Sequence, residues 1–161
     1  MKSYIIGVAM FIVFMIFTVF QYDYNLHQQY LYNLKFAAQE AAAAGSQYWS
    51  KAEFAEGRFI FNQTEGKKAA EYIIRQQLKL DEFLQPLSGS YWQEKVTYTM
   101  EFFDDSNSNF PFLYENADHL FTITIAEPSV VITINAGKPR YRLIENPPDA
   151  VRVAAHEWKE R

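Results

Sequence analysis

Residues 4–50 read YIIGVAMFIVFMIFTVFQYDYNLHQQYLYNLKFAAQEAAAAGSQYWS, and this stretch decides the fold of the 161-residue chain. It contains no proline, so nothing in it forces a helix to break. Residues 4–20 are apolar and uncharged, whereas residues 21–50 are amphipathic and end in an alanine-rich block. We therefore predict one long helix with two halves, of which the first meets lipid and the second needs cover by protein.

The apolar run is long enough to cross a bilayer. At about 1.5 Å per residue it spans about 25 Å, close to a hydrocarbon core of about 30 Å. Tyr4, Tyr22 and Tyr24 flank it and suit the two membrane interfaces. Lys2 precedes the run, and the next basic residue is Lys35. The positive-inside rule therefore predicts a cytoplasmic N-terminus and an extracytoplasmic remainder.

A cleavable signal peptide is the first alternative for this run. Cleavage needs small residues shortly after the apolar core, but residues 18–30 read TVFQYDYNLHQQY and lack them. A buried core helix of a soluble protein is the second alternative, and the uninterrupted apolar opening of the chain argues against it. We expect residues 1–22 to be a retained, single-pass anchor in the cell membrane.

Residues 23–50 continue the helix with one seam of apolar and small side chains. Steps of three and four residues place them on one face. The seam residues that we predict to pack are Leu34, Ala37, Ala41, Ala44 and Tyr48. Either the chain's own domain or a neighbouring helix must cover this seam. Gly45 lies inside the alanine block and predicts a bend or a close contact.

A second helix is predicted after residue 62. Asn62 and Glu65 have the spacing of a capping box, with Asn at the N-cap and Glu three residues on. Apolar residues then recur at helical spacing, and Pro86 stops the pattern, so we expect the helix to run to about residue 84.

Strands are predicted beyond Pro86. Residues 92–103, 120–126, 129–135 and 140–144 alternate or are rich in β-branched and aromatic side chains. The last three are close in sequence, so an antiparallel meander is the simplest arrangement. The fold class is therefore α+β, with an extracytoplasmic domain over residues 51–146. After Pro147 and Pro148, we expect residues 147–161 to be a charged, solvated tail.

The sequence carries little sign of catalysis. It has no cysteine, its three histidines stand alone, and no nucleophile motif or phosphate loop is present. Its net charge of −4 provides no basic field for nucleic acid. We expect neither an enzyme nor a bound cofactor, and no nucleic-acid partner.

One segment partly matches a calcium loop. Asp105, Asn107 and Asn109 follow the D-x-[DN]-x-[DN] pattern of oxygen ligands. The match then fails, because Phe110 stands where the turn glycine belongs and Asn116 where the bidentate glutamate belongs. A solvated loop between strands is the favoured interpretation, and a metal site is the weaker one.

The layout resembles pilins, and most closely the TadE/TadG-like pseudopilins of tight-adherence pilus systems. The resemblance is carried by residues 4–20, by LKFAAQEAAAAGSQYW over residues 34–49 and by FNQTEGKKAAEYII over residues 61–74. Type IV prepilins are cut after a glycine, and the fifth residue after that glycine is a glutamate. Here the only early glycine is Gly7, and the fifth residue after it is Ile12. Prepilin processing is therefore not expected.

The resemblance implies a bacterial envelope protein that helps to build or cap a surface appendage without catalysis. Its partners would be the lipid bilayer and either other copies of itself or pilus and secretion assembly proteins. The alternative is a membrane-anchored extracytoplasmic binding module that recruits one partner in a secretion, competence or sporulation machine.

Overall fold

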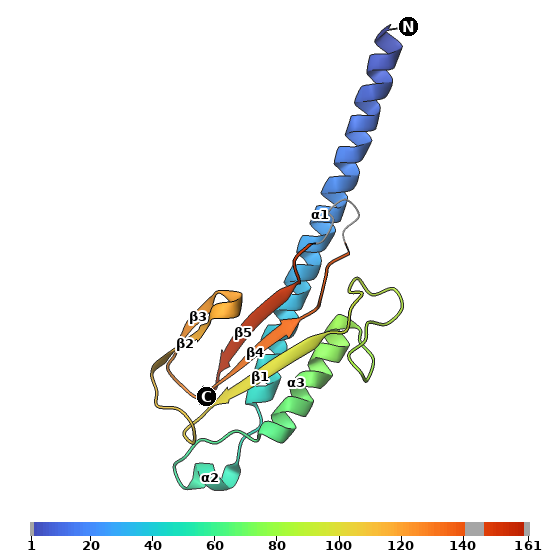
Figure 1. The fold of residues 1–161 in the computed structure, drawn as a ribbon. Coiled ribbons are helices and arrows are strands. Elements are labelled where there is room, and N and C mark those ends of the chain that lie inside the picture. Colours follow the sequence, from blue (N-terminus) through green and yellow to red (C-terminus); the bar gives the residue numbers. More distant parts are fainter. Residues whose placement is uncertain (1, 141–146, 160–161) are drawn as a thin grey trace.

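Helix α1, Lys2–Ser46, runs unbroken from one end of the molecule into the middle of a globular head (Figure 1). The computed structural model describes residues 2–140 and 147–159. The head combines the second half of α1 with two further helices and a small antiparallel sheet, which is an α+β fold as predicted. The first half of α1 projects from this head.

Two shorter helices follow α1. Helix α2, Lys51–Ala55, lies at the end of the head opposite the projecting half of α1 (Figure 1). Helix α3, Gln63–Leu78, begins with the predicted cap, because the backbone N–H of Glu65 donates to Asn62 Oδ1 at 3.3 Å. It ends about six residues earlier than expected. Lys79 adopts a left-handed conformation with φ 55°, and its N–H donates to the Arg75 carbonyl, which closes the helix.

The main sheet has three strands in the order β1-β4-β5, all antiparallel. These are β1, Thr97–Phe103, β4, Ser129–Asn135, and β5, Val151–Glu157. Strands β2, Phe112–Asn116, and β3, Phe121–Ile125, form a separate hairpin around the short 3-10 helix Ala117–His119. The predicted meander is therefore wrong, since β3 pairs with β2 and not with β4. The strand expected over residues 140–144 falls, beyond residue 140, outside the described residues.

The expected solvated tail over residues 147–161 is also wrong. β5 lies within it and pairs with β4 over seven residues, from Ser129 opposite Glu157 to Asn135 opposite Val151. The physical reason is β4, whose residues are buried on both faces and need a hydrogen-bonding partner on each side. Charged residues in the segment suggested solvation, yet Ala154 is buried in the core beside α1.

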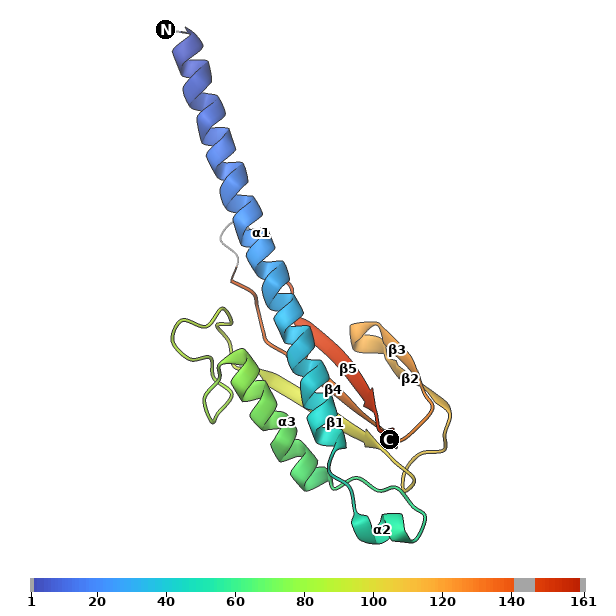
Figure 2. The same cartoon turned by 180° about the vertical axis from the view of Figure 1, so that it is seen from behind.

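The head is built in three layers. Helices α1 and α3 cover one face of the main sheet, and the hairpin β2-β3 covers part of the other (Figures 1 and 2). Ile132 and Ile134 of β4 meet the helices, whereas Val131 packs with Tyr114 and Ile125 of the hairpin. The alternation of β4 side chains therefore serves two hydrophobic cores at once.

Candidate functional site

The N-terminal half of α1 makes no buried contact with the head. Residues 2–22 are all exposed, and their apolar side chains surround the helix on every side. Within the described parts of the chain, α1 is the helix long and apolar enough to cross a membrane. A helix that is apolar all round and bare requires an apolar medium or partner. This half is the first part of the candidate site.

The second half of α1 buries its alanine seam in the chain's own head. Of the five residues predicted to pack, Leu34, Ala37 and Ala41 are fully buried against α3 and the sheet, and Ala44 is half-buried. Tyr48 is exposed and does not lie on the helix, which ends at Ser46. Beyond the helix, the Tyr48 carbonyl accepts the N–H of Asn62 at 2.9 Å, which holds this segment beside the start of α3.

Two glycines set the distance between α1 and α3. A Cβ added at Gly66 of α3 would lie 2.8 Å from the carbonyl oxygen of Gly45 in α1. A Cβ added at Gly45 would lie 2.1 Å from the terminal methyl carbon of Met100. The close contact predicted at Gly45 is confirmed, and Gly66 is a partner that the sequence did not single out.

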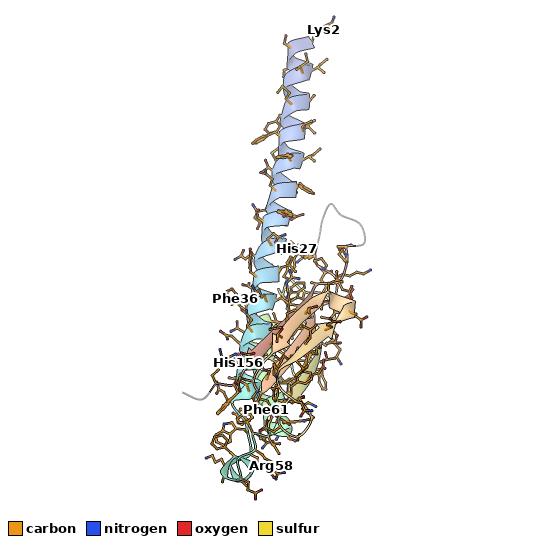
Figure 3. The ribbon with its side chains drawn as sticks, turned by 90° about the vertical axis from the view of Figure 1, so that its left-hand side faces the viewer. Lys2, His27, Phe36, Arg58, Phe61 and His156 are labelled. Carbon is orange, nitrogen blue, oxygen red and sulfur yellow. The ribbon has the colours of Figure 1, made fainter. Side chains whose placement is uncertain are left out.

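The opposite face of α1 is exposed and partly aromatic. Tyr32 and Phe36 are 62% and 58% exposed, and Figure 3 shows Phe36 on the side of α1 that points away from the sheet. Exposed residues recur along this face at steps of three and four: Asn25, Gln29, Tyr32, Phe36 and Gln39. This outer face was not predicted, although its spacing in the sequence repeats that of the alanine seam around the same helix.

A buried aromatic cluster anchors the head where α1 enters it. His27 Nδ1 lies 3.1 Å from the Tyr91 hydroxyl, and the Tyr30 and Tyr91 rings stack with their centroids 4.1 Å apart. Burial lowers the pKa of His27 below its usual value, and the Arg152 guanidinium lowers it further. The ring is therefore held in its neutral form at neutral pH. These contacts join the segment before β1 to α1.

Two of the three candidate calcium ligands make hydrogen bonds within the fold. Asp105 Oδ2 accepts the N–H of Phe59 at 2.6 Å, and Asn107 Oδ1 accepts the N–H of Asp104 at 3.0 Å. The Asn107 amide donates to the Phe102 carbonyl at 2.7 Å, and Asn109 is exposed. These groups hold a turn that ties the loop before α3 to the end of β1. Over residues 2–140 and 147–159, no cluster of three or more acidic or histidine side chains is placed to hold a metal.

A small pocket lies between α1 and the end of α3. Its volume is about 150 Å³, below the range of about 300–1,000 Å³ that is usual for ligand sites. Tyr30, Tyr91 and Trp92 line it together with Asn33 and Gln77. The aromatic rings pack on one another, so they offer few free faces to a ligand. The surfaces of α1 are stronger candidates than this pocket.

Comparison with protein-family models, with curated proteins and with solved structures finds no match to this chain. The candidate functional surfaces are therefore two exposed surfaces of α1: the bare apolar half and the outer face of the half that lies in the head.

Proposed function

We propose that this chain is a membrane-anchored, pilin-like structural or assembly component of a bacterial surface appendage or secretion system, without catalytic activity. The observation that supports the proposal is the division of α1. One uninterrupted helix has a bare apolar half and a second half that forms the centre of the head's core. Such a helix joins a lipid-embedded part to a folded part with no linker between them.

The direction of insertion follows from charge. Lys2 lies in the first turn of α1, and no other lysine or arginine occurs before Lys35. The positive-inside rule then places the N-terminus in the cytoplasm and the head outside the membrane. The absence of cysteine suits a head whose stability comes from its packed core rather than from disulfides.

Contact between copies uses the outer face of α1 in this proposal. The alanine seam is already covered by the head, so a neighbouring subunit cannot reach Ala37 or Ala41. Tyr32 and Phe36 are exposed and lie on the same helix as the apolar half. Aromatic side chains are enriched at the centres of protein interfaces, because they bury much area at low entropic cost.

Cysteine crosslinking tests this interface in the full-length protein in membranes. The natural chain has no cysteine, so Tyr32→Cys provides a single reactive site. We expect a crosslinked dimer with Tyr32→Cys, and its loss when Phe36→Glu is added, since a carboxylate disfavours burial of this face. Leu113→Cys, on the exposed side of the hairpin, is the matched control and should give none.

Two outcomes would contradict the proposal. If Tyr32→Cys gives no crosslink between two copies, this face does not mediate self-packing. If it gives one crosslink to a different protein, the result favours a binding module that recruits a partner. Ala41→Glu is unsuitable for this test, because it places a charge in the core between α1 and α3 and unfolds the head.

A further inference from the structure

The segment between α3 and β1, residues 79–96, sorts its apolar side chains by exposure. Leu80, Tyr91, Trp92 and Val96 belong to the hydrophobic core. Phe83 and Leu87 point outward instead and are 73% and 52% exposed. Single exposed apolar side chains are common on protein surfaces, so the position of this segment relative to the bilayer decides what these two side chains contact.

The turn that carries these two side chains is held by hydrogen bonds. Asp81 Oδ1 accepts the N–H groups of both Phe83 and Gln85 at 2.8 Å. The N–H of Asp81 donates to the Gln85 carbonyl, and the N–H of Leu87 donates to the Lys79 carbonyl. The exposure of Phe83 is therefore a property of a closed turn and not of an unfolded segment.

The same segment lies toward the end of the head from which the bare half of α1 projects (Figures 1 and 2). Tyr91 fixes its position, through its contact with His27 and its stacking on Tyr30. His27 is seven residues beyond Phe20, which is about 10 Å along a helix. The headgroup layer on each side of a bilayer is about 5–7 Å thick. Tyr91 thus lies about 3–5 Å beyond the outer edge of that layer, a distance that a large side chain pointing toward the bilayer can span.

We propose that Phe83 and Leu87 form a second contact with the lipid surface, which sets the orientation of the head on the membrane. This inference rests on the proposed membrane anchoring of α1. Phe and Leu side chains bind the interfacial region of a bilayer when a tether holds their surface beside it. The segment carries two lysines and three carboxylates, so the contact is apolar and does not depend on anionic lipid.

An environment-sensitive fluorophore on single cysteines tests this contact. The full-length protein is reconstituted in vesicles of phosphatidylcholine, a zwitterionic lipid, with the label at Phe83→Cys, Ile12→Cys or Leu113→Cys. We expect the labels at 12 and 83 to emit at shorter wavelength and to be quenched by nitroxide-bearing lipid. The label at 113, on a side chain 57% exposed, is the matched control and should report water.

The three labels separate failure of the lipid contact from failure of the anchor. A label at 83 in water, with the label at 12 in lipid, overturns the second contact and leaves the anchor standing. A label at 12 in water overturns the anchor and, with it, this inference. If the label at 83 is shielded only at high protein-to-lipid ratio and is not quenched by the nitroxide lipid, its partner is a second copy and the lipid contact is wrong.

Discussion

Gly66 allows α3 to approach α1 so closely that no side chain fits between the two backbones. The atom nearest to an added Cβ is a backbone oxygen of Gly45, and a backbone cannot rotate out of the way. Gly45 itself faces the end of Met100, which is flexible. The two glycines therefore contribute differently to the same interface.

Gly66→Ala should destabilise the head more than Gly45→Ala. We expect Gly66→Ala to lower the free energy of unfolding by up to about 2 kcal/mol, because an overpacking cost of about 1–3 kcal/mol is offset by about 1 kcal/mol of helix propensity gained from alanine. Gly45→Ala should cost less, since Met100 can move aside. Denaturant unfolding of the full chain in one detergent measures both, and an equal or larger loss at Gly45 would refute this account.

At the residue scale, sequence reasoning located the seam but not its partner. Leu34, Ala37 and Ala41 could be identified because their spacing matches the helical period and their side chains are small. Gly66 carries no such signal, since a single glycine in EGKKAA only lowers helix propensity. The exposure of Tyr32 and Phe36 could not be predicted, because which face the head covers depends on contacts between distant segments.

Among the elements, β5 shows how pairing can override composition. Its seven residues contain arginine, histidine and glutamate, so the segment was expected to be solvated. The alternation of Val151 and Val153 was the signal that could have indicated a strand. The segment becomes a strand because the buried strand β4 needs a hydrogen-bonding partner on this side, and the sequence of β5 alone does not contain that information.

Removal of β5 should therefore prevent the head from folding. A chain that ends at Pro148 leaves one edge of β4 without hydrogen bonds and uncovers Val131, which is buried at the centre of the sheet. We expect rapid proteolysis and no cooperative unfolding transition. A chain shortened only by residues 160 and 161 is the control. A cooperative transition in the chain ending at Pro148 would contradict the role assigned to β5.

The same distinction holds for the other elements. The start of α3 was predictable, because Asn62 and Glu65 act locally as a cap. The end of α3 was not, since it depends on Lys79 adopting a left-handed conformation rather than on Pro86. Local hydrogen-bonding signals thus identified element types, whereas the pairing of strands required the three-dimensional structure.

At the scale of the whole molecule, the head is independent of the bare half of α1. The apolar half of α1 has no buried residue over residues 2–22, whereas Asp23 and His27 are buried in the head. Length and apolar character were enough to predict this division from the sequence.

A fragment of residues 22–161 should fold with the stability of the full chain. Residues 2–21, which are described in the structure, are all exposed and none is buried against the head, so the core and its hydrogen bonds are retained. We expect the same denaturant midpoint for fragment and full chain in one detergent, and a soluble fragment without detergent. A lower midpoint for the fragment would mean that the bare half contributes to the core.

The unbroken course of α1 also has a mechanical consequence. Ser46 lies about 39 Å along the helix from Phe20, and the stretch between them contains no proline that would kink it. A force applied to the head is transmitted along the backbone hydrogen bonds of α1 to the lipid or protein that holds its apolar half. The helix therefore acts as a stiff connection and not as a flexible linker. The distance between the head and the membrane is fixed, and a pulling force is transmitted without prior extension of the chain.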